Sequence, residues 1–205
     1  MQRLGVDVSR ETEERLEVLV QTLERWQKAI NLISGKTLRD VWTRHILDSA
    51  QIVPLFPAQI RSLTDLGSGG GFPGLVVAAL RPDLDITLID SDARKGAYLG
   101  EAARQMGLAK EPRIVIGRIE AVPAAKADIV TARALAPLGQ LLHWAAPHRN
   151  DPAICLFHKG KGWQGELTEA GQDWDIEDQL FPSVTDRAAV LLRLDAYRAK
   201  DLRDR

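Results

Sequence analysis

The chain has 205 residues, a length typical of one α/β domain with a short extension. Its net charge of −1 excludes a protein-wide basic field, so any nucleic-acid contact must use a local basic patch. The single cysteine, Cys155, excludes an internal disulfide framework and fits a reducing compartment. No apolar run is long enough to cross a membrane, and we therefore expect a cytoplasmic protein with no membrane contact.

The N-terminal part predicts a helical extension over residues 1–57, followed by a main domain over residues 58–205. Residues 9–30 have an apolar face at helical spacing, with Ser9 as a suitable N-cap. The run from Thr37 to Asp40 fits a capping box and predicts a second helix running towards Pro54. We expect the extension to pack on the main domain, so that the two form effectively one domain.

A glycine loop follows the first predicted strand of the main domain. From Leu63 to Gly74 the sequence reads as a buried strand, an acidic residue, a glycine loop and a helix start. Gly67, Gly69 and Gly71 can take positive φ, and their lack of a Cβ lets the backbone approach a ligand closely. Since open α/β sheets bind ligands at the carboxyl ends of their strands, this loop predicts a nucleotide or nucleoside site.

Two acidic residues bear on which ligand the loop binds. The run Gly69 to Gly74 matches the dinucleotide pattern G-x-G-x-x-G, but the loop already opens at Gly67. Asp65, at the strand end, would repel a pyrophosphate and accept a hydrogen bond from the amine of S-adenosylmethionine (SAM). Asp90 ends the next predicted strand, where an acid commonly binds ribose hydroxyls of either NAD or SAM. The alternative for both acids is that they cap the turns that follow them.

Beyond the loop, predicted strands and helices alternate, which implies a mostly parallel sheet. The strands lie near 62–66, 85–90, 113–116, 127–132 and 153–157, and the helices near 73–80, 93–106, 137–146 and 163–171. Two further strands, 175–181 and 188–194, have so short a link that they must pair antiparallel. We predict an α/β, Rossmann-like fold whose final antiparallel hairpin suits a methyltransferase better than an NAD-binding protein.

Seven segments give the chain a specific resemblance to one family. They are Trp26 to Leu32, Arg44 to Ser49, Asp65 to Gly74, Leu88 to Ser91, Gly117 to Glu120, Thr131 to Ala134 and His158 to Gly160. In these segments the chain resembles the RsmG/GidB (glucose-inhibited division protein B) family of bacterial 16S rRNA guanine-N7 methyltransferases. The resemblance implies a class I SAM-dependent methyltransferase that modifies N7 of a guanine in the 530 loop of 16S rRNA. The implied partner is 16S rRNA or a small-subunit precursor, and we expect a monomer.

The resemblance also implies roles for individual residues. The implied cofactor-binding residues are Asp65, Gly67, Ser68, Gly69, Gly71, Phe72, Asp90, Ser91, Arg118, Ile119, Glu120 and Arg133. The implied catalytic or substrate-contacting residues are Arg133, Asn31, His45 and Lys159. Structural alternatives stay open: an Arg118–Glu120 surface pair, a loop-capping Asn31, and a His45 and Asp48 that only brace their helix. Eight basic residues are candidates for an RNA-binding rim, namely Lys28, Lys36, Arg39, Arg44, Arg94, Lys95, Lys159 and Lys161.

The chemistry of this reaction needs no general base, because guanine N7 carries a lone pair and has no proton to lose. Rate would come from holding N7 in line with the methyl group and from electrostatics around the sulfur. Cys155 lies mid-strand and fits a buried apolar position rather than a nucleophile. With one cysteine and scattered histidines we expect no metal site. The alternative function is a SAM-dependent methyltransferase that acts on a small molecule.

Overall fold

The computed structural model describes residue 5 and residues 8–200. A seven-stranded sheet in the order β3-β2-β1-β4-β5-β7-β6 forms its centre. The first five strands are mutually parallel, and β7 and β6 add as an antiparallel hairpin beside β5. The strands are β1 (Ser62–Leu66), β2 (Asp85–Asp90), β3 (Arg113–Ile116), β4 (Ala127–Arg133), β5 (Arg149–Lys159), β6 (Trp174–Pro182) and β7 (Val190–Ala199). The predicted α/β fold with a final hairpin is confirmed.

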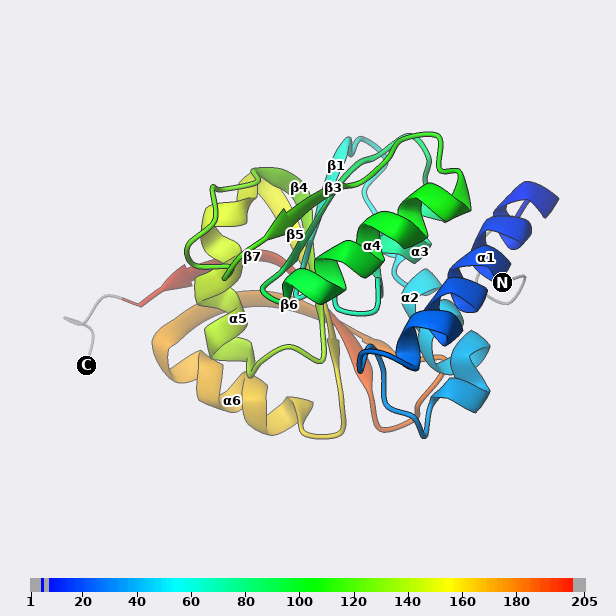
Figure 1. Ribbon diagram of the computed structural model, residues 1–205. Coiled ribbons are helices and arrows are strands. Elements are labelled where there is room, and N and C mark those ends of the chain that lie inside the picture. Colours follow the sequence, from blue (N-terminus) through cyan, green and yellow to red (C-terminus); the bar gives the residue numbers. More distant parts are fainter. Residues whose placement is uncertain (1–4, 6–7, 201–205) are drawn as a thin grey trace.

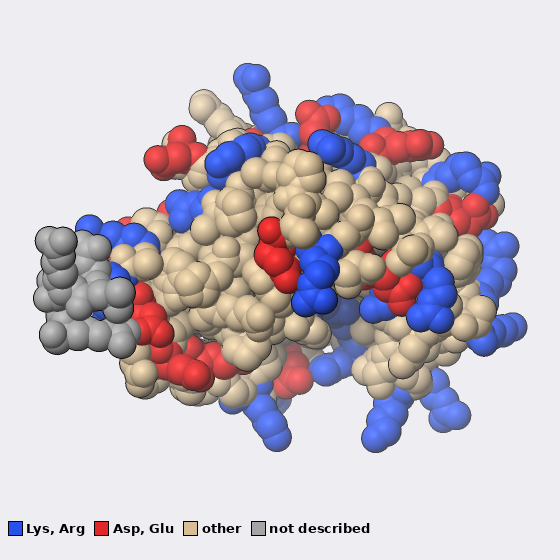
Figure 2. Space-filling view, turned by 60° about the vertical axis from the view of Figure 1, so that its left-hand side comes forward, with Lys and Arg blue, Asp and Glu red and all other residues tan. Residues whose placement is uncertain are grey.

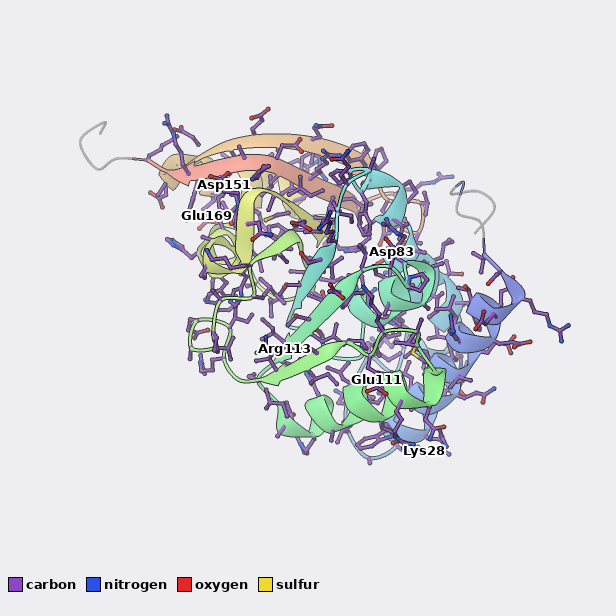
Figure 3. All side chains as sticks on the ribbon, turned by 90° about the horizontal axis from the view of Figure 1, so that it is seen from above. Lys28, Asp83, Glu111, Arg113, Asp151 and Glu169 are labelled. Atoms are coloured by element: carbon purple, nitrogen blue, oxygen red, sulfur yellow. The ribbon has the colours of Figure 1, made fainter. Side chains whose placement is uncertain are left out.

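Helices cover both faces of this sheet (Figure 1). On one side lie α1 (Arg10–Gln27), α3 (Gly74–Leu80) and α4 (Ala93–Met106), and on the other α5 (Leu138–Ala145), the 3-10 turn η5 (Ala146–His148) and α6 (Trp163–Asp173). Seen from above, Lys28 beside the end of α1 and Glu169 on α6 lie on opposite sides of the sheet (Figure 3). Because both faces are covered, β1 and β4 are buried almost throughout, and β1 even buries the polar residues Thr64 and Asp65.

The extension shares its core with the main domain. Leu16, Leu19 and Leu23 of α1 belong to the same buried cluster as Tyr98 and Leu99 of α4. On this basis we propose that the extension and the main domain unfold as one unit. Cys155 lies in the second cluster, on the other face of the sheet, where it is fully buried. Burial raises the pKa of this thiol to about 12, as expected of an apolar core residue rather than a nucleophile.

The two predicted N-terminal helices differ in outcome. Ser9 caps α1, because its Oγ accepts a hydrogen bond from the Thr12 backbone N–H at 3.2 Å. The predicted second helix forms as one continuous helical stretch, but its hydrogen bonding is irregular. It consists of the 3-10 turn η2 (Leu38–Asp40), the π-helical segment η3 (Trp42–Leu47), α2 (Asp48–Ala50) and the 3-10 turn η4 (Val53–Leu55), and the residues between them also have right-handed helical backbone angles. The predicted capping box is wrong, because the Thr37 hydroxyl donates to the Ser34 carbonyl at 2.8 Å instead of capping a helix. None of the described helices has the length and apolar character of a membrane span.

Candidate functional site

The glycine loop between β1 and α3 has the predicted backbone conformation. Gly67, Gly69 and Gly71 have φ values of +66°, +51° and +84°, in the left-handed region that favours glycine. A Cβ on Gly67 would lie 2.5 Å from a methyl group of Leu135, so the Leu135 side chain would have to shift. The backbone conformation is therefore the main reason for glycine at this position.

Two buried carboxylates accept hydrogen bonds from backbone N–H groups in and next to the glycine loop. Asp90 accepts from the Gly69 N–H at 2.8 Å and from the Asp92 N–H at 2.9 Å, the turn cap that was the alternative for this residue, and it also lines a cavity. Asp65 is fully buried and accepts from the Gly74 N–H at 3.2 Å and from the Thr131 hydroxyl at 2.8 Å. Burial raises the pKa of Asp65 to about 6. This carboxylate has no exposed surface and caps the start of α3, which was the alternative to a ligand contact, and a contact of Asp65 with the SAM amine stays a prediction.

Two adjoining cavities open at the carboxyl ends of the strands, with volumes of about 480 Å³ and about 280 Å³. Gly67, Lys95 and Ala134 line both of them. The smaller cavity is also lined by Asp90, Ser91, Arg118, Ile119 and Glu120. The larger one is lined by Ser34, Thr37, His45, Asp48, Ser68, Gly69, Phe72, Arg133, His158 and Ser183, among others. The loop therefore adjoins both a nucleoside-sized space and a second space bounded by the N-terminal extension.

The residues around the smaller cavity fit an adenosyl group better than a dinucleotide. A pyrophosphate needs free backbone N–H groups at the loop. Here the N–H groups of Ser68, Gly69, Gly71 and Phe72 are all donated within the protein. A Cβ on Gly69 would meet only a backbone oxygen at 3.6 Å and a carboxylate oxygen at 4.0 Å, so this glycine leaves room for a ligand at the cavity wall. Asp90 and Ser91 offer polar oxygens to ribose hydroxyls.

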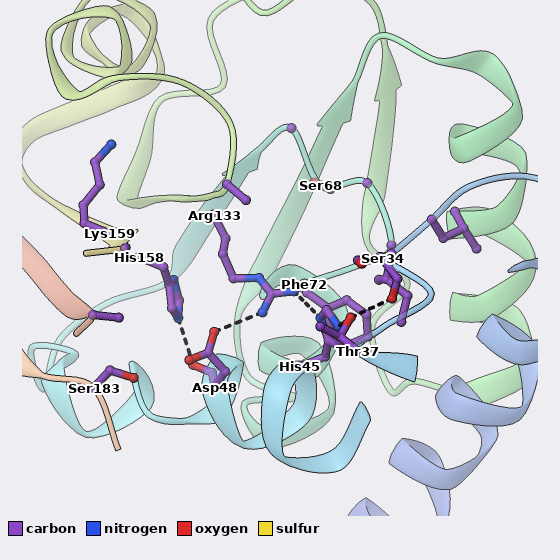
Figure 4. A pocket seen from close by; sticks show the side chains of 18 of the residues that line it. Ser34, Thr37, His45, Asp48, Ser68, Phe72, Arg133, His158, Lys159 and Ser183 are labelled. Atoms are coloured by element: carbon purple, nitrogen blue, oxygen red, sulfur yellow. Dashed lines mark hydrogen bonds and ion pairs between the residues drawn. The ribbon is translucent and has the colours of Figure 1, made fainter. Parts of the chain in front are cut away.

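Arg133 stands at the end of β4 in the larger cavity (Figure 4). Its Nη1 donates to Asp48 Oδ2 at 3.0 Å and to the Arg44 carbonyl at 2.9 Å, and its Nη2 donates to His45 Nδ1. The guanidinium carbon lies 5.4 Å from the centroid of the Phe72 ring. Its Nε–H donates to no partner among the described residues. Arg133 is thus held by the extension on one edge and keeps donors for a ligand.

His45 is neutral and fully engaged. Because a guanidinium only donates, His45 Nδ1 must be an acceptor, and the proton is on Nε2, which lies 2.8 Å from the Thr37 hydroxyl oxygen. Burial, with Arg133 nearby, lowers the pKa of His45 to about 4. Neither ring nitrogen is free to accept a proton from a substrate, so His45 is not placed as a general base.

Two predicted substrate residues have other partners. Lys159 is 6% exposed, and its Nζ donates to Glu166 Oε2 at 2.6 Å and to the Ala136 carbonyl at 3.0 Å. Its ammonium points away from Arg133 in Figure 4, but Lys159 also lines the larger cavity, so its contact with RNA or base stays a prediction. Asn31 is exposed and lines neither cavity, and its Oδ1 accepts from Gln27 Nε2 at 3.2 Å. Asn31 thus supports Gln27, which caps the loop, and a role of Asn31 in binding stays a prediction.

Arg118 and Glu120 form the surface pair that was the alternative to cofactor binding. Arg118 Nε lies 3.0 Å from Glu120 Oε1, and both side chains are exposed. Both also line the smaller cavity, with the buried Ile119 between them. The ion pair between Arg118 and Glu120 is therefore compatible with both residues contacting a ligand in the smaller cavity.

Sequence reasoning missed Gln27, which shapes one wall of the larger cavity. Its Oε1 accepts from the N–H groups of Leu32 and Ile33, both at 3.0 Å, and its Nε2 donates to the Ile33 carbonyl at 2.8 Å. Leu32 and Ile33 line that cavity. The one signal was its place within the Trp26 to Leu32 segment, since a side-chain-to-backbone clamp has no pattern of its own.

The cavities and the glycine loop agree with the comparison of the whole chain with known families. The family described as rRNA small subunit methyltransferase G (GidB) matches residues 12–189. The chain belongs to this family. Two relatives are named "Ribosomal RNA small subunit methyltransferase G". The one from Cereibacter sphaeroides is 46% identical, and the alignment covers 93% of this chain and 94% of the relative. The one from Paramagnetospirillum magneticum is 48% identical, and the alignment covers 91% of this chain and 90% of the relative.

Two solved methyltransferase structures share the fold of this chain. A putative SAM-dependent methyltransferase from Methanococcus maripaludis has a TM-score of 0.59, covering 89% of this chain and 94% of its own at 12% identity. A SAM-dependent methyltransferase from Aquifex aeolicus has a TM-score of 0.57, covering 88% and 97% at 13% identity. These distant likenesses establish the class I methyltransferase fold and nothing finer.

Proposed function

We propose that this chain transfers a methyl group from SAM to N7 of a guanine in the 530 loop of 16S rRNA. As a member of the methyltransferase G family it is a SAM-dependent methyltransferase of small-subunit ribosomal RNA. The observation that carries the residue-level proposal is the pair of adjoining cavities, which share Gly67 and Ala134 and differ in lining. One is suited to a nucleoside, and the other places Arg133 beside it.

The smaller cavity is our proposed adenosine site. Asp90 and Ser91 would bind the ribose hydroxyls, while Ile119 with its neighbours Arg118 and Glu120 would lie along the adenine. Gly67, Ser68 and Gly69 lead from there into the larger cavity and would hold the methionine part. When bound, SAM supplies a methyl group on a positively charged sulfur.

The larger cavity is our proposed site for the target guanine. Guanine presents two acceptors on its major-groove edge, O6 and N7. Arg133 has only donors, so it would hold O6 while N7 stays free to react. The engaged state of both His45 nitrogens supports a mechanism without a general base. Rate enhancement would then come from orientation, which well-placed reactants can supply by several orders of magnitude.

The proposed RNA contacts begin at the mouth of these cavities. Lys95 lines both and takes part in no ion pair within residues 8–200. Lys36 and Lys161 are exposed next to the cavity-lining residues Thr37 and Gly160, and Arg39 is exposed two positions after Thr37. On the face shown in Figure 2, acidic and basic side chains are mixed, and several Lys or Arg side chains project from the lower edge. Lys95, Lys36, Arg39 and Lys161 would form the local basic patch that the chain's small net charge requires of any nucleic-acid contact.

We further propose that the enzyme acts as a cytoplasmic monomer on 16S rRNA or on a small-subunit precursor. The test is transfer from methyl-labelled SAM to small-subunit particles and to naked 16S rRNA, both taken from cells that lack this enzyme. Digestion to nucleosides should give label in 7-methylguanosine. Label in a different nucleoside, or none in RNA while SAM binding is intact, would contradict the proposal. Label in a small-molecule fraction instead would favour the alternative substrate class.

A further inference from the structure

The loop between β6 and β7 is docked onto the N-terminal extension. Val184 N–H donates to Gln51 Oε1 at 2.9 Å, and Thr185 Oγ1 donates to Asp48 Oδ1 at 2.5 Å. An exposed ion pair, Arg44 with Asp186 at 3.2 Å, lies on the same contact. These partners are more than 130 positions apart in the sequence. The ends of this loop line the larger cavity, and the loop is bonded to the helical segment that carries His45 and Asp48.

Asp48 connects this loop to Arg133. One oxygen of its carboxylate accepts from Thr185 Oγ1 and from Gln51 Nε2 at 2.8 Å, and the other accepts from Arg133 Nη1 at 3.0 Å. His158 Nε2 donates to the Asp48 backbone carbonyl at 2.8 Å (Figure 4). The Asp48 and Arg133 side chains are only 17% and 15% exposed. Both oxygens of the Asp48 carboxylate are therefore held by side-chain donors.

The charge on Asp48 is also maintained. Burial on its own would raise the pKa of this carboxyl group, but His158, Thr185 and Arg133 together hold it below its ordinary value. A charged carboxylate fixed at both oxygens orients the guanidinium that it binds, because charge-assisted hydrogen bonds are short and directional.

We propose that Thr185 and Asp48 are positioning residues for Arg133, through which the β6–β7 loop sets the orientation of its guanidinium towards the target base. Thr185 lines neither cavity and is linked to the larger one through Asp48 and Arg133, so it would act on the base side of the site and not on SAM. This inference rests on the proposed function, because it assigns the larger cavity to the base. It adds that the β6–β7 loop does two things: its ends, Ser183 and Val190, line the larger cavity, and its Thr185 sets the orientation of Arg133 through Asp48.

The experiment compares Thr185→Val, which removes the hydroxyl at nearly constant size, with Thr185→Ser, which keeps it. Thr168→Val is the matched control, because the Thr168 hydroxyl bonds to a backbone carbonyl within α6, away from the site. Each protein is assayed for methyl transfer to small-subunit particles lacking the modification, for SAM affinity by calorimetry and for thermal unfolding. Since misplacement by about 1 Å can cost up to ~100-fold in rate, we expect kcat of Thr185→Val to fall about tenfold with unchanged SAM affinity. Thr185→Ser and Thr168→Val should match the parent protein.

Asp48→Asn tests the same link from its other side and should lower kcat more than Thr185→Val does, again with SAM affinity retained. Parent-like kcat in Thr185→Val, failure of Thr185→Ser to restore it, or parallel loss of SAM affinity would each overturn the inference. Failure of the proposed function would look different, because the parent protein itself would then transfer no methyl group to the particles.

Discussion

Gly69 offers the sharpest test of where SAM binds, because the chain contains a matched control. Gly69 and Gly107 both have positive φ, +51° and +57°. A Cβ at Gly107, the C-cap of α4, would meet nothing within 4 Å, and one at Gly69 would make only ordinary contacts with the protein. Alanine at either position therefore carries the same backbone cost, about 1–2 kcal/mol for a left-handed residue with a side chain.

The two substitutions should differ only in ligand binding. Gly69 lines the larger cavity, so the added methyl group would occupy space that the proposed methionine part needs. Overpacking of a fitted space costs about 1–3 kcal/mol, and about 1.4 kcal/mol corresponds to a tenfold change in affinity. Gly69→Ala should therefore weaken SAM binding about 5- to 100-fold, whereas Gly107→Ala should leave it unchanged.

The assay is calorimetric titration of each protein with SAM, with thermal unfolding measured in the absence and presence of ligand. Both variants should lose similar stability without ligand. With saturating SAM the parent and Gly107→Ala should be stabilised, and Gly69→Ala should be stabilised less, since ligand stabilisation follows the ratio of concentration to Kd. Equal SAM affinity in the two variants would refute the placement of the cofactor against Gly69.

Three further predictions follow from individual side chains. Arg133→Lys keeps the charge but loses the planar donor edge, and kcat should fall by about 100-fold with little change in thermal unfolding; parent-like turnover would remove Arg133 from the site. Glu166→Gln leaves Lys159 without its carboxylate and should cost about 2 kcal/mol in urea unfolding, below the 3–5 kcal/mol of a fully buried pair because Glu166 is 30% exposed. Asp65 binds its proton more tightly in the folded protein, with a pKa of about 6 against 3.8, so its contribution to stability is present below pH about 4 and is lost as pH rises through 6. Asp65→Asn should therefore gain up to about 3 kcal/mol relative to the parent across that window, and a constant difference between the two proteins would contradict the burial argument. The comparison must be made between variants, because His45, with its pKa lowered to about 4, changes stability in the opposite direction over a similar range.

The sequence by itself determined the features that depend on neighbouring residues. Gly67, Gly69 and Gly71 can take positive φ values because they lack a Cβ. Ser9 caps α1 because its hydroxyl accepts from the backbone N–H of Thr12, only three positions later. The alternation of strands and helices determined the parallel sheet, and the short link at residues 183–189 determined the antiparallel hairpin. Motif order was also enough to indicate the family, whose match covers residues 12–189.

Only the tertiary structure decided what the polar side chains do. Folding places Glu166 beside Lys159, a predicted ligand contact, and a buried ammonium takes a carboxylate partner when one is in reach. Asp65 is also a predicted ligand contact, and its strand is covered on both sides, so its carboxylate serves the protein's own N–H and hydroxyl groups. Arg133, Asp48 and Thr185 come from β4, the extension and the last hairpin. Local sequence fixes backbone conformation because its causes lie within a few residues, whereas the partner of a polar group depends on which distant segments the fold brings within hydrogen-bonding distance.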